Sequence, residues 1–375
     1  MIKVEKIDLS DQQQVNEFIM LPFRLYKECP QWVPPFINDI KLMLNKKKHP
    51  FYELNDADFF AVYRDGRMVG RVAAMENRSF NDYHKCKNAQ FYLFDIENDQ
   101  EAANALFEKV FVWVRERGLD KLVGPKGFSA FDGYGILVEG FEERQMMVMM
   151  NYNYEYYATL LESIGFEKEV DFVSCHLEQK NFHLPEKAQE IARRVRERGS
   201  FKVVQFKNKR QIVKMANEIG HAYNDTFVNN WEYYPLTQGE INLLLDNLLS
   251  VINPKLVKII TYNEKIVGFL LAFPDISAAL QRHGGKITLW GIIDIMLEMR
   301  KAKTVSLNGA GVLPEYHGRG GAALLYSEMQ RTIEDFDFEN AELTQVAETA
   351  VQMRKDLINV GGRAYKNHRV FRKTL

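Results

Sequence analysis

A glycine-rich loop between an expected strand and an expected helix holds the residues of this chain that are best suited to chemistry. The segment 305–325 reads VSLNGAGVLPEYHGRGGAALL, in which a strand-like run and a proline turn precede Gly318, Gly320 and Gly321. Glycines let a backbone close around a ligand, and a helix expected from Ala322 begins with unpaired N–H groups at its positive dipole end. This pattern predicts a cradle for an anion such as a phosphate.

Two other phosphate-binding loops fit these residues less well. A Walker loop is excluded because no Gly-Lys-Ser or Gly-Lys-Thr follows the glycines. A dinucleotide-binding pattern matches Gly318, Gly320 and Ala323, but residues 314–317 separate the expected strand from the loop. Only about 50 residues follow the loop, which is too few for the second half of a doubly wound fold.

The segment 312–322, VLPEYHGRGGA, resembles the coenzyme A loop of the GCN5-related N-acetyltransferase superfamily. The core of that loop is Arg or Gln, any two residues, Gly, any residue, and Gly or Ala; His317, Gly320 and Ala322 take these three places, so His317 departs from the pattern. The resemblance implies that main-chain N–H groups hold the pyrophosphate of acetyl-CoA or another acyl-CoA, while a strand pairs with the pantetheine arm. The cofactor-binding residues implied are Gly311, Val312, His317, Gly318, Arg319, Gly320, Gly321 and Ala322.

The segments around the loop follow the element order of the same superfamily. A hairpin is expected within 256–273, a strand at 341–346, a helix at 349–360 and a last strand at 364–372. The closing run GGRAYKNHRVF resembles the ending of many bacterial members.

A distant internal repeat predicts two copies of this unit. Residues 58–76 form a hairpin pattern like that of 256–273, and both contain a Val-Gly step, at Val69-Gly70 and Val267-Gly268. We expect an α/β fold of two tandem acyl-CoA N-acyltransferase-like domains, 1–180 and 185–375, each a mixed, mostly antiparallel sheet flanked by helices.

The first copy lacks the glycine loop. In its place stand Glu97, Asp99 and Glu101 at the start of an expected helix that ends at Gly118. These carboxylates would cap the helix themselves and repel a pyrophosphate. The first copy is therefore expected to be a degenerate domain that binds no acyl-CoA at this position.

Glu348 is the best candidate for a catalytic base, because it follows the strand expected at 341–346 where the cofactor arm should emerge. A carboxylate at a helix start is also explained by the helix dipole alone. Ala350 and Leu357 stand where the superfamily often has Asn and a Tyr acid, so solvent is the expected proton source for the leaving thiolate.

Two segments are candidates for recognising the acceptor. Residues 221–235, HAYNDTFVNNWEYYP, are rich in aromatic and amide side chains, and Trp231 and Tyr233 are the candidates for binding it. The segment 287–303, ITLWGIIDIMLEMRKAK, predicts an apolar helix ending in a basic cluster. Burial at a domain interface is the favoured interpretation of this helix; a lid over an acyl chain and an interfacial helix in contact with lipid are alternatives.

Composition limits the other function classes. A net charge of −1 gives no overall attraction to nucleic acid. No apolar run reaches the roughly 18 residues of a membrane span, no signal segment is evident, and three scattered cysteines suggest a reducing compartment. No spacing of a metal site is evident either. The expectation is a cytoplasmic bacterial protein without a metal, of undetermined oligomeric state.

These observations together predict an acyl-CoA-dependent N-acyltransferase, with acetyl transfer to an amine of a small molecule or peptide as the default. Two alternatives stay open. One is a non-catalytic acyl-CoA sensor or interaction protein, favoured by the missing Asn and Tyr. The other is an aminoacyl or peptidyl transferase that resembles known tandem-domain proteins using charged transfer RNA.

Overall fold

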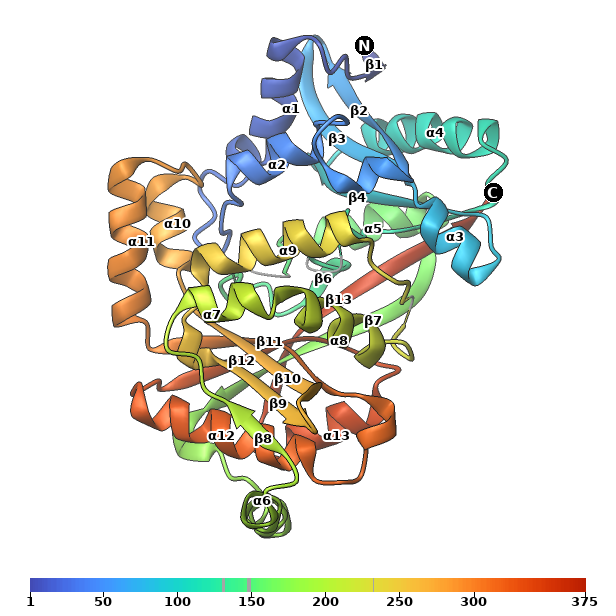
Figure 1. Cartoon of the computed structure of the whole chain (residues 1–375). Coiled ribbons are helices and arrows are strands. Elements are labelled where there is room, and N and C mark those ends of the chain that lie inside the picture. Colours follow the sequence, from blue (N-terminus) through green and yellow to red (C-terminus); the bar gives the residue numbers. More distant parts are fainter. Residues whose placement is uncertain (130–131, 147–149, 232) are drawn as a thin grey trace. The chain divides into compact units, whose positions relative to one another are not determined.

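The computed structural model describes residues 1–129, 132–146, 150–231 and 233–375 (Figure 1). The chain divides into two compact units, each of which we describe by itself. The first unit comprises Met1–Val173, Ile276–Glu298 and Lys366–Leu375, and the second unit comprises Ser174–Asp275 and Met299–Tyr365. This division differs from two consecutive domains at 1–180 and 185–375, because the chain passes between the units more than once.

The first unit is built on a mixed, mostly antiparallel sheet. Its strands follow the order β1, β2, β3, β4, β5, β13, and β6 also pairs with β13. Their bounds are β1 Ile2–Lys6, β2 Asp56–Arg64, β3 Arg67–Glu76, β4 Asn88–Ile96, β5 Lys121–Gly124, β6 Ile136–Glu139 and β13 Arg363–Thr374. Between β2 and β3, Asp65 and Gly66 have φ of 52° and 80°, as a two-residue hairpin turn of type I′ requires. The expected first hairpin is confirmed.

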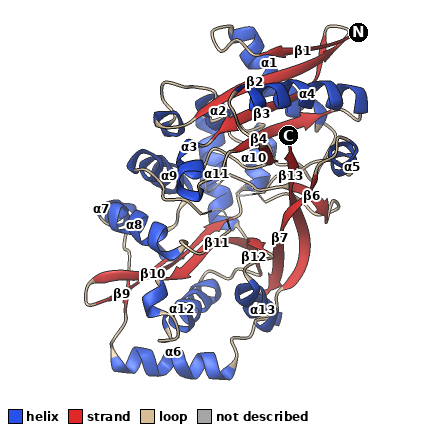
Figure 2. Ribbon diagram, turned by 90° about the vertical axis from the view of Figure 1, so that its right-hand side faces the viewer, coloured by secondary structure: helices blue, strands red, loops and turns tan. Residues whose placement is uncertain are grey.

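Helices cover both faces of this sheet (Figure 2). Strand alternation directs Phe60 and Val62 into one core with helix α4 (Gln100–Glu116), and Phe59 and Ala61 into another with α1 (Gln12–Leu25). The other α-helices of this unit are α2 Ile37–Met43, α3 Arg78–His84, α5 Tyr156–Ser163 and α10 Ser277–His283, and it also contains most of α11 (Leu289–Lys301).

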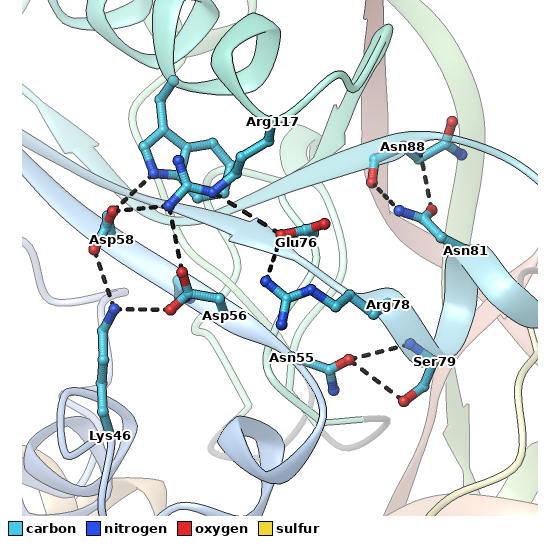
Figure 3. A network of polar contacts seen from close by, with 12 residues as sticks. Lys46, Asn55, Asp56, Asp58, Glu76, Arg78, Ser79, Asn81, Asn88 and Arg117 are labelled. Atoms are coloured by element: carbon cyan, nitrogen blue, oxygen red, sulfur yellow. Dashed lines mark hydrogen bonds and ion pairs between the residues drawn. The ribbon is translucent and has the colours of Figure 1, made fainter.

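A charged network fastens the end of α4 to the sheet (Figure 3). Asp58, 5% exposed, accepts hydrogen bonds from Trp113 Nε1 at 2.8 Å and Lys46 Nζ at 3.1 Å. Arg117 stacks over the Trp113 indole, 3.8 Å from its centre, and also contacts Asp58 at 3.3 Å. Burial alone would raise the pKa of Asp58, but these bonds and one from Lys6 lower it below its usual range.

The second unit contains a sheet with the strand order β7, β12, β11, β10, β9, β8. The bounds are β7 Glu167–Glu178, β8 Lys202–Val204, β9 Val257–Tyr262, β10 Lys265–Pro274, β11 Thr304–Val312 and β12 Asn340–Ala347. Its helices are α6 Glu186–Arg198, α7 Lys209–Lys214, α8 Ala216–Thr226, α9 Gln238–Val251, α12 Gly321–Asp335 and α13 Val351–Asn359. The elements expected around the glycine loop are therefore confirmed, with boundaries shifted by one or two residues.

Each unit contains a strand segment from the other half of the sequence. Residues 366–375 of β13 lie in the first unit, where Phe371 is opposite Gly124 of β5. Residues 174–178 of β7 lie in the second unit, where the Ser174 hydroxyl accepts from the N–H of Gln345 at 3.0 Å. The last strand expected for each copy is present, but the end of β7 and most of β13 belong to the unit built mainly from the other half of the sequence.

The apolar segment 287–303 forms helix α11 (Leu289–Lys301), and the expectation that this helix is buried is wrong. Gly291 is its one buried residue, whereas Trp290 is 74% and Leu289 is 72% exposed. The carboxylates of α11 lie toward α10, so the apolar side chains are left on the outer face. Nowhere in the described ranges is a helix both long enough and apolar enough to cross a bilayer.

Candidate functional site

Strands β11 and β12 of the second unit pair over only part of their length. They are parallel from Thr304 opposite Asn340 to Leu307 opposite Leu343, after which both strands continue unpaired with each other. A bulge in β11 begins there, because the register against β10 shifts and Gly309 has a φ of 95°. The divergence leaves a strand edge open beside β11.

The register with β10 identifies which main-chain groups of β11 face this edge. Gly268 lies opposite Val312, and the N–H of Leu313 donates to the carbonyl of Val267 at 2.8 Å. Because antiparallel pairs alternate between bonded and non-bonded positions, the N–H and C=O of Val312 then point away from β10, whereas those of Gly311 point toward it. Val312 can therefore pair with an extended ligand through its main chain, whereas the main-chain groups of Gly311 face β10 and cannot.

Gly311 makes room for helix α8. A β-carbon at Gly311 would lie 2.1 Å from Cγ2 of Thr226, the last residue of α8. The nearby rings of Tyr223, Phe227 and Phe269 pack together, with Tyr223 and Phe227 4.6 Å apart. The absence of a side chain at position 311 thus lets α8 approach the diverging strand closely.

The loop after β11 leads into an uncapped helix start. Gly320, with φ of 89°, precedes the first residue of α12 and offers no side-chain cap. The N–H groups in the first turn of a helix have no partner within that helix, and they carry the positive end of its dipole. A β-carbon at Gly320 would meet Ile191 and Val195 of α6, each at 2.7 Å. Glycine at position 320 therefore allows both the positive φ of the turn and the close approach of α6.

The side chains of His317 and Arg319 lie on the exposed side of the loop. The Nε2–H of His317 donates to the carbonyl of Val312 at 2.7 Å, which ties the loop back to β11. The Arg319 guanidinium lies 5.2 Å from the centre of the Tyr316 ring and is exposed. A β-carbon at Gly318 would have no neighbouring atom within 4 Å, so this residue borders open space. Arg319 is thus the exposed cation closest in sequence to the helix start.

Polar side chains that the sequence interpretation missed line one face of β11 and β12. Ser306, Asn308, Glu342 and Thr344 are each at most 8% exposed, and the Ser306 hydroxyl bonds to both Asn308 and Thr344. Among the described residues, neither Asn308 Nδ2 nor Thr226 Oγ1 has a hydrogen-bond partner. The available signal was the alternation of polar and apolar residues in VSLN and AELT, whose apolar members pack on α12.

The other predicted residues lie in loops of the second unit. Glu348 is half-buried, directly after β12, in the turn before α13 begins at Val351. Trp231 and Tyr233 lie between α8 and α9, and both are partly exposed. The end of their loop is fixed by Asn224, whose amide bonds to both main-chain groups of Leu236. The roles of these three residues in catalysis and acceptor binding stay predictions.

The corresponding edge in the first unit is closed by tyrosines. Ile96 of β4 lies opposite Gly70, as Val312 lies opposite Gly268. The N–H of Ile96 donates to Tyr157 Oη at 2.9 Å, and Tyr156 Oη donates to the carbonyl of Ile96 at 2.8 Å. Burial raises the pKa of Tyr157 well above its usual value, so this hydroxyl stays protonated.

The helix that follows β4 is capped by its own carboxylate, as the sequence predicts. Asp99 accepts from the N–H of Ala102 at 3.0 Å and pairs with Arg64 at 2.5 Å. The side-chain bonds from Arg64 lower the pKa of Asp99. Glu101 also pairs with Arg64, and Glu97 pairs with Arg67. The helix start in the first unit therefore has its charge satisfied within the protein.

The residues of the second unit fit an acyl-CoA on two structural grounds. The start of α12 has no side-chain cap, and Gly318 in the loop before it borders open space, so the N–H groups of the first turn suit a pyrophosphate. Unpartnered polar atoms at Asn308 and Thr226 also suit a ligand that carries amides, as pantetheine does. Within the described ranges no cluster of three or more His, Cys, Asp or Glu residues is arranged to hold a metal ion.

Comparisons with known proteins extend over the whole chain. No protein-family model matches it. A bacterial ceramide synthase of Caulobacter vibrioides is 26% identical over 98% of this chain and 97% of its own length, and protein YghO of Escherichia coli is 22% identical over 97% and 94%. A tandem GNAT protein from the clavulanic acid biosynthesis pathway, solved without acetyl-CoA, superposes with a TM-score of 0.58, at 11% identity, over 100% of this chain and 98% of its own. The chain therefore has the fold of a tandem GCN5-related N-acetyltransferase.

Proposed function

We propose that the chain is an acyl-CoA-dependent N-acyltransferase whose second unit binds the acyl donor and whose acceptor is an amine. The observation that carries this proposal is the divergence of β11 from β12, followed within one loop by the uncapped start of α12. An open strand edge suits the amides of pantetheine, and an uncapped helix start suits a pyrophosphate. The fold shared with tandem acetyltransferases supports this assignment.

Main-chain groups provide most of the donor site in this proposal. The N–H groups at the start of α12 receive the pyrophosphate, and Arg319 adds a cation at the exposed side of the loop. The main chain of Val312 pairs with the pantetheine arm. His317 acts through its bond to Val312, which holds the loop in place, rather than as a direct phosphate ligand.

A coenzyme A thioester supplies an acyl group that is already activated for transfer. The amine nitrogen attacks the thioester carbonyl carbon, so that a C–N bond forms and the C–S bond breaks. We propose Glu348 as the base that takes the proton from the nitrogen, directly or through a water molecule. Solvent returns a proton to the leaving thiolate, because Leu357, which is 6% exposed, stands where the superfamily often has a tyrosine.

A long-chain amine is the acceptor that we favour over a small molecule or peptide. Ceramide synthesis is the N-acylation of a long-chain amino alcohol, and the relative of that name matches this chain from end to end. The same comparison favours a long acyl chain over the acetyl group expected by default. Trp231 and Tyr233 are the side chains that we propose to contact the acceptor.

Calorimetric titration of acetyl-CoA and palmitoyl-CoA tests the donor site. Ala322 is exposed in the first turn of α12, so Ala322→Glu adds a carboxylate that suits the helix dipole but opposes a pyrophosphate. We expect this variant to fold normally and to lose binding at least tenfold, whereas Ala322→Gln, equal in size and uncharged, retains it. Equal affinity in both variants would show that the donor does not bind at the start of α12.

Turnover experiments then test the reaction. Acetyl-CoA and palmitoyl-CoA are each combined with sphinganine, spermidine and a short peptide, and released thiol is measured together with the mass of the product. We expect an amide product from palmitoyl-CoA and sphinganine. Donor binding without turnover on any acceptor would favour the second candidate, an acyl-CoA-binding protein without catalysis, which the replacement of the family's Asn and Tyr by Ala350 and Leu357 supports.

A further inference from the structure

We propose that helix α11 docks the protein on the surface of an anionic lipid membrane. Seven apolar residues of its segment are at least 41% exposed. They are Ile287, Leu289, Trp290, Ile292, Ile293, Met296 and Leu297. This proposal concerns a surface outside the donor site and does not depend on the proposed reaction.

The exposed residues form one face of the helix. Leu289, Ile292, Ile293, Met296 and Leu297 recur at the three- and four-residue spacing of a single helical stripe. Trp290 extends the stripe at its start, and an indole suits the boundary between lipid headgroups and acyl chains. An apolar stripe with this spacing is typical of helices that lie in a membrane interface.

The opposite face of α11 is occupied by ion pairs with α10. Arg282 binds Asp294 through two bonds, at 2.8 and 3.1 Å, and also pairs with Glu298. His283 Nε2 lies 2.9 Å from Asp294. The bonds from Arg282 lower the pKa of Asp294. The two carboxylates of α11 are therefore matched by cations and add no net repulsion toward an anionic surface.

Unmatched cations flank the apolar stripe. Lys286 precedes the helix, and Arg300 and Lys301 end it; all three are exposed, and none has a carboxylate partner among the residues that the structure describes. Lys303, by contrast, pairs with Asp337 and Glu339. The charge left uncompensated beside the stripe is positive, which complements anionic lipid headgroups rather than a neutral apolar partner.

Helix α10, which carries the ion-pair partners of α11, is attached to the rest of the first unit by hydrogen bonds. The Gln281 side chain donates to the carbonyls of Pro30 and Trp32 at 2.8 and 2.9 Å, and the N–H of Ile37 donates to the carbonyl of Gly285 at 3.1 Å. A β-carbon at Gly285 would lie 2.0 Å from the Pro35 carbonyl oxygen. The apolar face is thus presented by a fixed element and needs no rearrangement to meet a surface.

Vesicle sedimentation with the full chain tests the proposal. We expect binding to vesicles of phosphatidylcholine mixed with phosphatidylglycerol, and weaker binding to phosphatidylcholine alone. Trp290→Glu should weaken binding at least tenfold, whereas Val112→Glu, at an apolar residue of α4 that is 43% exposed, should leave it unchanged. Trp290→Phe should keep binding but remove the blue shift of tryptophan fluorescence on vesicle addition.

The charge contribution is tested separately. Arg300→Ala with Lys301→Ala should weaken binding to the anionic vesicles about 30-fold, since each cation near such a surface contributes about a fivefold factor. Lys47→Ala with Lys48→Ala, a pair of exposed lysines elsewhere in the first unit, is the matched control. No binding by the parent protein, or equal loss in both double variants, would overturn the proposal. A dimer that Trp290→Glu dissociates, with no vesicle binding, would assign the face to a second copy instead.

Discussion

Ile96 and Val312 occupy the same position in two copies of one fold, but only the strand edge at Ile96 is closed by tyrosines. Tyr157 and Tyr156 bond to its N–H and carbonyl at 2.9 and 2.8 Å. At Val312 the carbonyl accepts from His317, part of the loop itself. The hydroxyls at Ile96 occupy the groups that an extended ligand would need, and on this difference we expect a single donor site, in the second unit.

The first prediction is a stoichiometry of one acyl-CoA per chain. The site at α12 has an uncapped helix start, whereas Asp99 already caps the equivalent helix in the first unit. Calorimetric titration should therefore give a single class of site, and Ala322→Glu should remove it. Two equivalent sites, or residual tight binding in that variant, would contradict this assignment.

The second prediction concerns the contact between Gly311 and Thr226. A β-carbon at position 311 would lie 2.1 Å from Thr226 Cγ2, so Gly311→Ala should destabilise the protein by about 1–3 kcal/mol through overpacking. Thr226→Ser removes the methyl group that would collide. In urea unfolding, the double variant should recover most of the loss; strict additivity of the two single effects would show that the close approach is not the cause.

The third prediction separates the roles of a charge and a hydrogen bond at His317. Its Nε2–H bonds to the Val312 carbonyl at 2.7 Å. Loss of one such bond is worth about 0.5–1.5 kcal/mol, so His317→Ala should weaken acyl-CoA binding about 2- to 10-fold. Gln carries an N–H that can reach the same carbonyl, and His317→Gln should restore affinity. A Lys that restored it equally would favour a direct role for the charge.

Local patterns predicted the elements and the loop, but not their partners. The hairpin at 58–76, the glycine loop and the capping by Asp99 follow from spacing and turn chemistry within short windows, and the structure contains each of them. The strand exchange could not be predicted, because β13 has the same local pattern whichever sheet it joins. Apolar composition likewise predicted that α11 is a helix but wrongly indicated burial, since burial depends on neighbours distant in sequence.

Polar residues at the site show the same limit. Asn308 and Thr344, which follow the last paired residues of β11 and β12, each form a hydrogen bond with the Ser306 hydroxyl. Their alternation along each strand is visible in the sequence. That they share a face depends on the parallel register of β11 and β12, which only the fold supplies.

The fourth prediction compares two carboxylates as the catalytic base. Glu348 is half-buried at the end of β12, whereas Glu342 is 3% exposed opposite Ser306, before the strands diverge. If Glu348 is the base, Glu348→Gln should lower kcat about 100-fold or more, remove the acid limb of the pH–rate profile and leave acyl-CoA affinity unchanged. Glu342→Gln is the matched control. The reverse pattern would move the base to Glu342.

The fifth prediction is a loss of stability in acid that depends on Asp58. Hydrogen bonds and ion pairs from Lys6, Lys46 and Trp113 outweigh burial and hold the pKa of Asp58 below its usual value of about 4. A group whose pKa is lower in the folded than in the unfolded state stabilises the protein above the unfolded pKa, and this stabilisation disappears as the pH falls through the folded pKa. Asp58→Asn should therefore lower the free energy of unfolding by about 1–3 kcal/mol at pH 7 and by progressively less as the pH falls below 4.

Urea unfolding across this pH range measures the difference, with Asp82→Asn, at an exposed carboxylate in the same unit, as the control. A constant difference between parent and Asp58→Asn at every pH would mean that the side chain acts by packing and not by its charge.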